Sequence, residues 1–173
     1  MISVYFLILR RFIFLALLQG LLFNRFDLFG SFDPFIALVF ILTFPIKINR
    51  VTFLIISFCF GFCLDLFTNS LGINAAACIT AAFVRPYVLN FVFGSFYDPH
   101  GVKILKDYVS ESTFYQQVLY LSTIVFIHHF TMFSLEAFSL DLTLLILYKT
   151  LINSILSLIF CVTLIYIMIE NEK

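Results

Sequence analysis

The feature that most constrains this sequence is a succession of apolar segments, most of them long enough to cross a membrane as a helix. A membrane-crossing helix needs about 20 largely apolar residues. The segments of this kind run over residues 3–24, 33–46, 51–69, 73–95, 114–135 and 141–169. With 62% hydrophobic and 12% charged residues and a mean hydropathy of +1.10, a soluble domain of this size would expose large apolar patches. The sequence therefore predicts an all-α integral membrane protein, with six transmembrane helices in a single bundle over residues 1–173.

The second segment is the weakest of the six. Pro34 and Pro45 bracket ten mostly apolar residues, and Lys47 follows directly. Because proline lacks an N–H donor and its ring crowds the preceding turn, a helix cannot run through both positions undisturbed. Whether this segment spans the membrane completely is left open. The first segment, by contrast, lacks a small-residue cleavage pattern after its apolar core and is predicted to be a retained span rather than a signal peptide.

The distribution of basic residues predicts the orientation. Six spans put both termini and the loops near 47–50 and 96–113 on one side of the membrane. That side carries Arg10, Arg11, Lys47, Arg50, Lys103, Lys106 and Lys173, and the opposite loops carry Arg25. Because cytoplasmic loops are enriched in Lys and Arg, we expect both termini in the cytoplasm. The long cytoplasmic stretch after the fourth segment is expected to be either a solvated linker or a docking surface for a cytoplasmic partner.

The formal net charge is zero and no basic or acidic run occurs, so charge gives no argument for a nucleic-acid partner. The four cysteines all lie in apolar segments without the pair spacing of a metal site, and we expect them to be small packing residues. They are Cys59, Cys63, Cys78 and Cys161.

Two helices carry a stripe of small residues that ends in a charge. Each stripe is spaced by four residues, so its members share one helix face. The stripes are Ser57, Gly61 and Asp65 on the third segment, and Ala77, Ala81 and Arg85 on the fourth. Stripes of small residues let helix backbones approach each other closely in lipid. We therefore expect an antiparallel hairpin, joined by the turn "TNSLGIN" and packed along these stripes.

Asp65 and Arg85 are not expected to pair with each other. Asp65 is five residues from Ser70 and Arg85 is fifteen residues from it, a depth difference of about 15 Å at 1.5 Å per residue. Asp65 is instead expected to meet the turn, where Asn74 and the backbone near Gly72 offer donors, and Gly72 is expected to supply a positive φ.

Arg85 needs other acceptors, because a charge at membrane depth costs about 2.5 to 3.5 kcal/mol on insertion scales. One candidate is the Ala82 carbonyl, which loses its helical donor because Pro86 has no N–H. The other candidates are Asn90, Asn153 on the last helix and lipid headgroups.

The other polar residues of the spans suggest no chemistry. His128 and His129 are adjacent, so they point about 100° apart, and no acidic or Cys ligand lies at metal spacing. Lys149 is expected to anchor the helix at the membrane interface, and Gln19 to make a packing hydrogen bond. No nucleophile and base, paired-carboxylate or phosphate-loop pattern occurs, so no enzymatic activity, cofactor or metal is predicted.

The stretch "FGFCLDLFTNSLGINAAACITAAFVRPYVLNFVFG", with Gly61 and Asp65, the Leu71–Gly72 turn and the alanine-rich helix ending in Arg85–Pro86, resembles the rod shape-determining membrane protein family MreD. The opening "RFIFLALLQGLLFNRFDLFGSFDPFIALVFILTFPIKINR" is similar to the first two helices and basic turn of MreD from the Bacteroidetes lineage. The resemblance covers about residues 10–97 and is only hydropathic beyond them.

This resemblance implies a non-enzymatic scaffold of the cell-elongation machinery in the bacterial inner membrane. The implied partners are MreC, RodA with its partner transpeptidase, and MreB indirectly, besides membrane lipids. The six-helix arrangement is also similar to the substrate-binding subunits of energy-coupling-factor transporters. A small-molecule transporter subunit is therefore the alternative, although the first helix has only Ala16 in place of an Ala-x-x-x-Ala docking pattern. A membrane-embedded hydrolase or acyltransferase is disfavoured for want of a nucleophile with its base.

The structural or partner-facing candidates share one hairpin. They are Gly61, Asp65, Gly72, Asn74, Ala77, Ala81, Arg85 and Pro86.

Overall fold

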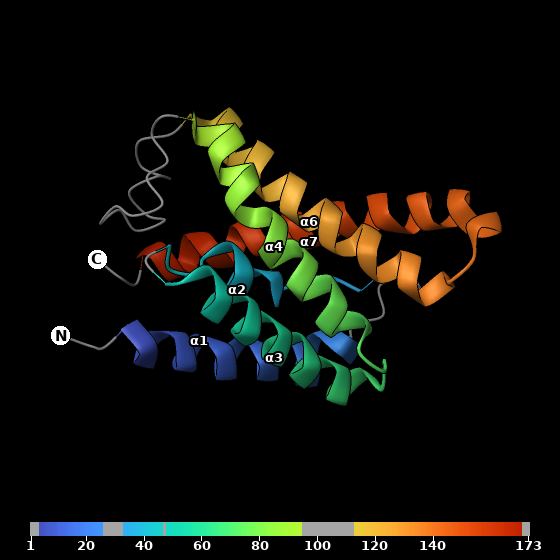
Figure 1. Ribbon diagram of the computed structural model, residues 1–173, viewed down its shortest axis with the longest axis horizontal. Coiled ribbons are helices and arrows are strands. Elements are labelled where there is room, and N and C mark those ends of the chain that lie inside the picture. The colour runs from blue at the N-terminus through green and yellow to red at the C-terminus, as the bar shows by residue number, and fades with distance from the viewer. Residues whose placement is uncertain (1–3, 26–32, 47, 95–112, 171–173) are drawn as a thin grey trace.

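A computed structural model of the chain describes residues 4–25, 33–46, 48–94 and 113–170. These residues are helical over most of their length and include no β-strand. The helices pack around one apolar core (Figure 1). The predicted all-α class is therefore confirmed. The stretch after the fourth segment, predicted to be cytoplasmic and considered as a docking surface, lies mostly outside the described residues.

Five helices are long and apolar enough to cross a membrane. The first comprises α1, Val4–Leu17, and a π-helical turn, Leu18–Leu22, followed by a 3-10 turn, Phe23–Arg25. The others are α3, Arg50–Thr68; α4, Ile73–Phe93; α6, Phe114–Ala137; and α7, Thr143–Glu170, which follows a 3-10 turn at Leu140–Leu142. Five of the six predicted segments are thus long helices whose ends agree with the prediction within a few residues.

The second predicted helix, 33–46, is much shorter than expected. The only regular helix in it is α2, Leu38–Leu42, and all five of its residues are buried. Pro34 and Pro45 explain the difference, because each removes an N–H and restrains the residue before it away from helical backbone. The segment runs through the middle of the bundle, where α2 contacts α1, α4, α6 and α7.

The ends of the helices fall into two groups. The start of α1 and the end of α7 lie at one end of the bundle, on the left of Figure 1, and we call this the terminal end. The α3–α4 and α6–α7 turns lie at the opposite end, which we call the turn end. Segment 33–46 runs from the turn end towards the terminal end, because Asp33 contacts Asn153 on α7 and Thr43 contacts Arg11 on α1.

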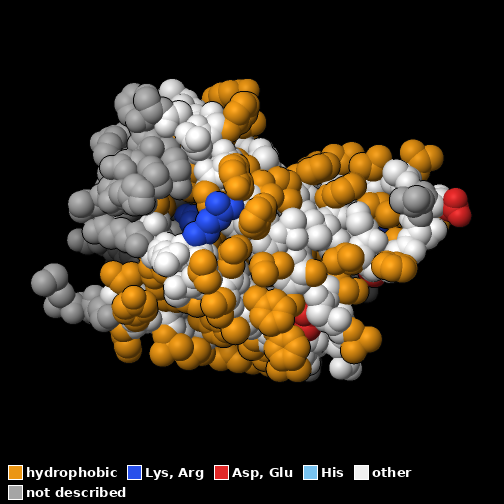
Figure 2. All heavy atoms as spheres, viewed as in Figure 1, with side chains coloured by type: hydrophobic (Ala, Val, Ile, Leu, Met, Phe, Trp, Pro, Cys, Tyr) orange, Lys and Arg blue, Asp and Glu red, His pale blue; other side chains and the backbone are white. Residues whose placement is uncertain are grey.

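The outward faces of the helices are strongly apolar. Figure 2 shows hydrophobic side chains over most of the visible helical surface, with basic side chains near the terminal end and acidic ones at the turn end. Phe6, Ile55, Phe91 and Ile155 each expose more than half of their surface. An apolar exterior around a core that contains polar side chains is the pattern expected for a bundle solvated by lipid.

Candidate functional site

The backbone of segment 33–46 creates the main polar requirement of the bundle. A helix leaves its first N–H groups and last C=O groups without intrahelical partners, and α2 is so short that these groups dominate it. No water reaches the centre of a bilayer to satisfy them. The neighbouring helices must therefore supply the donors and acceptors.

Acceptor side chains meet the start of the segment. The Gln19 Oε1 atom accepts hydrogen bonds from the N–H groups of Ile36 (2.8 Å) and Ala37 (3.2 Å). The Ser157 Oγ atom accepts from the N–H of Phe35 at 2.8 Å. Gln19 is thus a packing residue, as predicted, and its partners are backbone groups. It lies in the π-helical turn of the first helix, a type of local widening that is frequent at specialised positions.

His129 holds Ser157 in this role. Its Nδ1 atom lies 2.9 Å from the Val125 carbonyl, and its Nε2 atom lies 3.1 Å from Ser157 Oγ. A proton on Nδ1, bonded to the carbonyl, leaves Nε2 to accept from the serine hydroxyl, and the serine oxygen then accepts from Phe35 N–H. Both His129 and Ser157 are fully buried, so this arrangement is a structural hydrogen-bond chain and not a solvent-accessible nucleophile with its base.

Donor side chains meet the other end of the segment. One Arg85 nitrogen, Nη2, donates to the carbonyls of Phe44 (2.7 Å) and Leu42 (3.2 Å). The Tyr120 hydroxyl donates to the Leu42 carbonyl at 3.0 Å and accepts from Arg85 Nε at 2.9 Å. The Arg85 guanidinium also lies 5.3 Å from the centre of the Phe53 ring. A cation at the carboxyl end of α2 complements the partial negative charge of its unpaired carbonyls.

The acceptors predicted for Arg85 are therefore replaced by the carbonyls of Leu42 and Phe44. Asn153, one of the predicted acceptors, contacts the opposite end of segment 33–46, where its Oδ1 accepts from Asp33 N–H at 3.1 Å. Sequence reasoning missed Tyr120 and Ser157 altogether, because a hydroxyl within an apolar span has many structural explanations.

Asp65 lies at the turn between α3 and α4, as predicted. Its carboxylate oxygens accept hydrogen bonds from the N–H groups of Asn74 (2.9 Å) and Ala75 (3.0 Å), the first-turn donors of α4. The Ser70 hydroxyl also donates to it. Gly72 precedes α4 with φ of +93°, which confirms the predicted positive φ. A carboxylate on α3 thus caps the next helix.

Close helix contact places Asp65 within reach of α4. A Cβ atom on Gly61 would lie 2.6 Å from the Ala75 Cα and from the Asn74 carbonyl oxygen, both backbone atoms. Ala77 and Ala81 are fully buried on α4. The predicted antiparallel hairpin of α3 and α4 is confirmed, and Gly61 of the α3 stripe lies at its close contact. Arg85, the last residue of the α4 stripe, bonds instead to segment 33–46 and to α6.

The other candidates of the hairpin divide by burial. Asn74 is 4% exposed and Arg85 is 3% exposed, so in this chain they bond within the fold. Pro86 lies inside α4 and is half-buried, and Gly72 is half-buried at the turn. The turn itself offers a different residue, Leu71, which is 100% exposed with φ of +47°.

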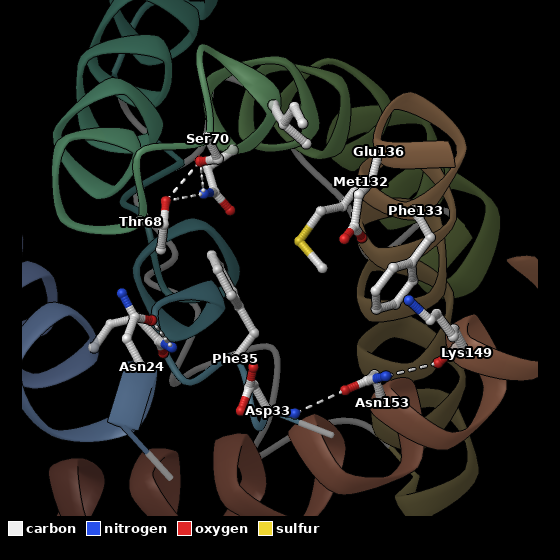
Figure 3. Close-up of a pocket in the computed structure, with 13 residues that line it drawn as sticks. Asn24, Asp33, Phe35, Thr68, Ser70, Met132, Phe133, Glu136, Lys149 and Asn153 are labelled. Carbon is white, nitrogen blue, oxygen red and sulfur yellow. Dashed lines mark hydrogen bonds between the residues drawn. The ribbon is translucent and has the colours of Figure 1, made fainter. Parts of the chain in front are cut away.

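A polar pocket of about 430 Å³ opens at the turn end (Figure 3). Its walls come from the first helix, the start of segment 33–46, the α3–α4 turn, α6 and α7. Figure 3 shows the Glu136 carboxylate and the Lys149 side chain directed towards the cavity. The Lys149 ammonium lies 5.7 Å from the centre of the Phe133 ring. Lys149 therefore faces this pocket rather than acting only as the predicted interface anchor.

In the described part of the chain, His128 and His129 are not joined by further His, Cys, Asp or Glu side chains into a group of three or more that could hold a metal ion. Comparisons of the chain with protein-family models, with curated protein sequences and with solved structures find no match.

Proposed function

We propose that this chain is a non-enzymatic scaffold of the bacterial inner membrane, of the MreD type, in the peptidoglycan synthesis machinery of cell elongation. It would bind MreC and support RodA and its partner transpeptidase, with MreB linked indirectly. In this proposal the chain crosses the membrane six times, segment 33–46 is the second crossing, and both termini are cytoplasmic, in an arrangement like that of energy-coupling-factor substrate-binding subunits.

The internal hydrogen bonding supports a scaffold. Gln19, Arg85, Tyr120 and Ser157 all bond to the backbone of segment 33–46. Side chains held in this way stabilise one shape, because each departure leaves a backbone group unpaired in lipid. A fixed shape suits a protein that positions its partners.

The observation that carries the partner contact is Leu71. Its side chain is fully exposed, and its φ of +47° is uncommon for a residue with a Cβ atom. The turn around it is fixed by Asp65, Ser70 and Asn74. An apolar side chain that is presented on a rigid turn by strained backbone is a reason to propose a contact. Phe138, after α6, shares these properties, with 88% exposure and φ of +42°.

Co-purification with MreC tests this proposal. Leu71→Ser should reduce the recovery of MreC while the protein melts normally. Phe91→Ser, which changes an 83% exposed aromatic side chain near the other end of α4, is the matched control and should leave recovery unchanged. Equal recovery of MreC with Leu71→Ser and with the parent protein would refute a contact at Leu71. Asp65→Ala and Gly61→Leu also belong in the series, but they report on packing first because both residues are buried.

A substrate-binding subunit of a small-molecule transporter is the second candidate, and the turn-end pocket favours it. Ala16 is 3% exposed, so it packs inside this chain rather than offering an outward surface to another subunit. Neighbouring genes distinguish the two candidates, because MreC, transpeptidase and RodA genes would support the scaffold, and a pair of ATPase genes would support the transporter.

A further inference from the structure

Two polar atoms of residues that line the turn-end pocket are buried without a hydrogen-bond partner among the described residues. Asn74 lines the pocket and is 4% exposed. Its amide nitrogen donates to Ser70 Oγ at 2.9 Å and Thr68 Oγ1 at 3.1 Å, whereas its oxygen, Oδ1, is buried without a hydrogen-bond partner. A buried acceptor without a donor costs about 1 to 3 kcal/mol. A ligand N–H at this position would remove that cost.

Asn24 provides the opposite case on another wall of the same pocket. Its oxygen accepts from Gln19 at 3.1 Å, and its nitrogen, Nδ2, is buried without an acceptor. The pocket thus offers one unused acceptor, on α4, and one unused donor, beyond the end of the first helix. Two unpaired groups of opposite character around one cavity indicate a ligand that has both a donor and an acceptor.

Charges of both signs face the same cavity. The Glu136 carboxylate, from α6, and the Lys149 ammonium, from α7, both point towards it (Figure 3). Among the interactions of the described residues, these two do not form an ion pair with each other. Phe35 and Met132 add apolar wall. The volume of about 430 Å³ lies within the usual range for small-molecule sites.

We propose that the turn-end pocket binds a small zwitterion, an amino acid or a dipeptide, through Glu136 at its ammonium group and Lys149 at its carboxylate. Asn24, which lies across the cavity from Lys149 (Figure 3), and Asn74 bond to other polar groups of the ligand. Charged hydrogen bonds are the strongest that such a site can make. The scaffold role needs no small ligand, so this inference goes beyond it. MreC capture and ligand binding are separate measurements, and either can fail without the other.

Thermal unfolding in detergent, followed by calorimetric titration, tests the proposal with two defined probes. One is a pool of the free L-α-amino acids, and the other is a pool of dipeptides. We expect at least one pool to raise the melting temperature of the parent and one component to bind on titration. The primary amine and the carboxylic acid that correspond to that component should each bind at least tenfold more weakly, because each loses one charged contact.

Two substitutions and a control localise the binding. Glu136→Gln and Lys149→Met should each weaken binding about tenfold or more, whereas Arg10→Met, which removes an exposed charge from α1 at the terminal end, should not change it. Asn24→Ala provides a further pocket variant if Lys149→Met folds poorly. Absence of stabilisation and binding with both pools would overturn the proposal. Binding that Glu136→Gln, Lys149→Met and Asn24→Ala all leave intact would overturn it equally.

Discussion

Asp65 and Arg85 are the two charged side chains that are buried within the described residues. Each bonds to backbone groups at the end of another helical segment, groups that have no partner within their own helix. Asp65 accepts from the first N–H groups of α4, nine and ten residues later in the chain. Arg85 donates to carbonyls at the end of α2, 41 and 43 residues earlier.

The two residues differ in charge and in how far along the sequence their partners lie. Asp65 acts within one hairpin, so a tight turn and a close helix contact suffice to form its site. Arg85 closes a long loop of the chain around a buried segment and requires α2, α4 and α6 to be in place together. We therefore expect changes at Arg85 to disturb the whole bundle, and changes at Asp65 to disturb mainly the start of α4.

Arg85→Leu should have the largest effect. It removes the donor from the Phe44 carbonyl and one of two donors from the Leu42 carbonyl, and a buried carbonyl without a donor costs about 1 to 3 kcal/mol. We expect a large loss of melting temperature or no folded protein. Arg85→Lys should restore part of the stability, because it keeps the charge but not the fork of donors. Arg10→Leu, an exposed arginine on α1, is the control, and equal melting of Arg85→Leu and the parent would contradict the account.

Gly61→Leu should have the next largest effect. Its side chain would meet the Ala75 and Asn74 backbone at 2.6 Å, so α3 and α4 must separate, at a cost of about 1 to 3 kcal/mol or more. Separation also withdraws Asp65 from its donors. Cys59→Leu adds bulk at an exposed position on the same helix and should melt like the parent. Similar melting of the two variants would show that the close contact does not matter.

Asp65→Ala should have a smaller and local effect. The N–H groups of Asn74 and Ala75 lose their acceptor, and loss of a helix cap costs about 0.5 to 2 kcal/mol. Hydrogen exchange should accelerate at these amides and stay unchanged near Leu42. Asp65→Asn, which keeps an acceptor oxygen, should fall between Asp65→Ala and the parent. Equal acceleration of hydrogen exchange across the whole bundle would contradict a local role for Asp65.

Leu71→Gly should have the smallest effect, and in the opposite direction. A residue with a Cβ atom pays about 1 to 2 kcal/mol for left-handed backbone, and Leu71 has φ of +47° with no buried side chain. We expect the free energy of unfolding to rise by up to about 1 kcal/mol, part of the gain being lost to the greater freedom of glycine in the unfolded chain. Denaturant titration in mixed micelles measures it. A clear loss of stability would show that the turn needs the leucine side chain.

Much of the hairpin could be predicted from the sequence, and little of the Arg85 site could. The spacing of four residues identified the stripe of Gly61 and Asp65, and the glycine after "TNSL" identified the turn, because both are local patterns. Pro34 and Pro45 indicated a weakened second helix. The partners of Arg85 are backbone carbonyls, which every residue carries, so no side-chain pattern marks them. Only the path of segment 33–46 through the bundle reveals them.

The hydrogen bonds from Arg85 to the backbone of the buried segment can be tested directly by NMR. Phe44–Pro45 is the only Phe–Pro pair in the sequence, so carbonyl-¹³C phenylalanine with ¹⁵N proline selects the Phe44 carbonyl. Solid-state NMR of the protein in lipid, with ¹⁵N also in the arginine guanidinium groups, then measures the dipolar coupling between the two sites. The Nη2–O distance of 2.7 Å puts the Phe44 carbonyl carbon within about 4 Å of Nη2. This separation predicts a weak but measurable coupling, which should be lost in Arg85→Lys. No coupling in the folded parent protein would contradict the account.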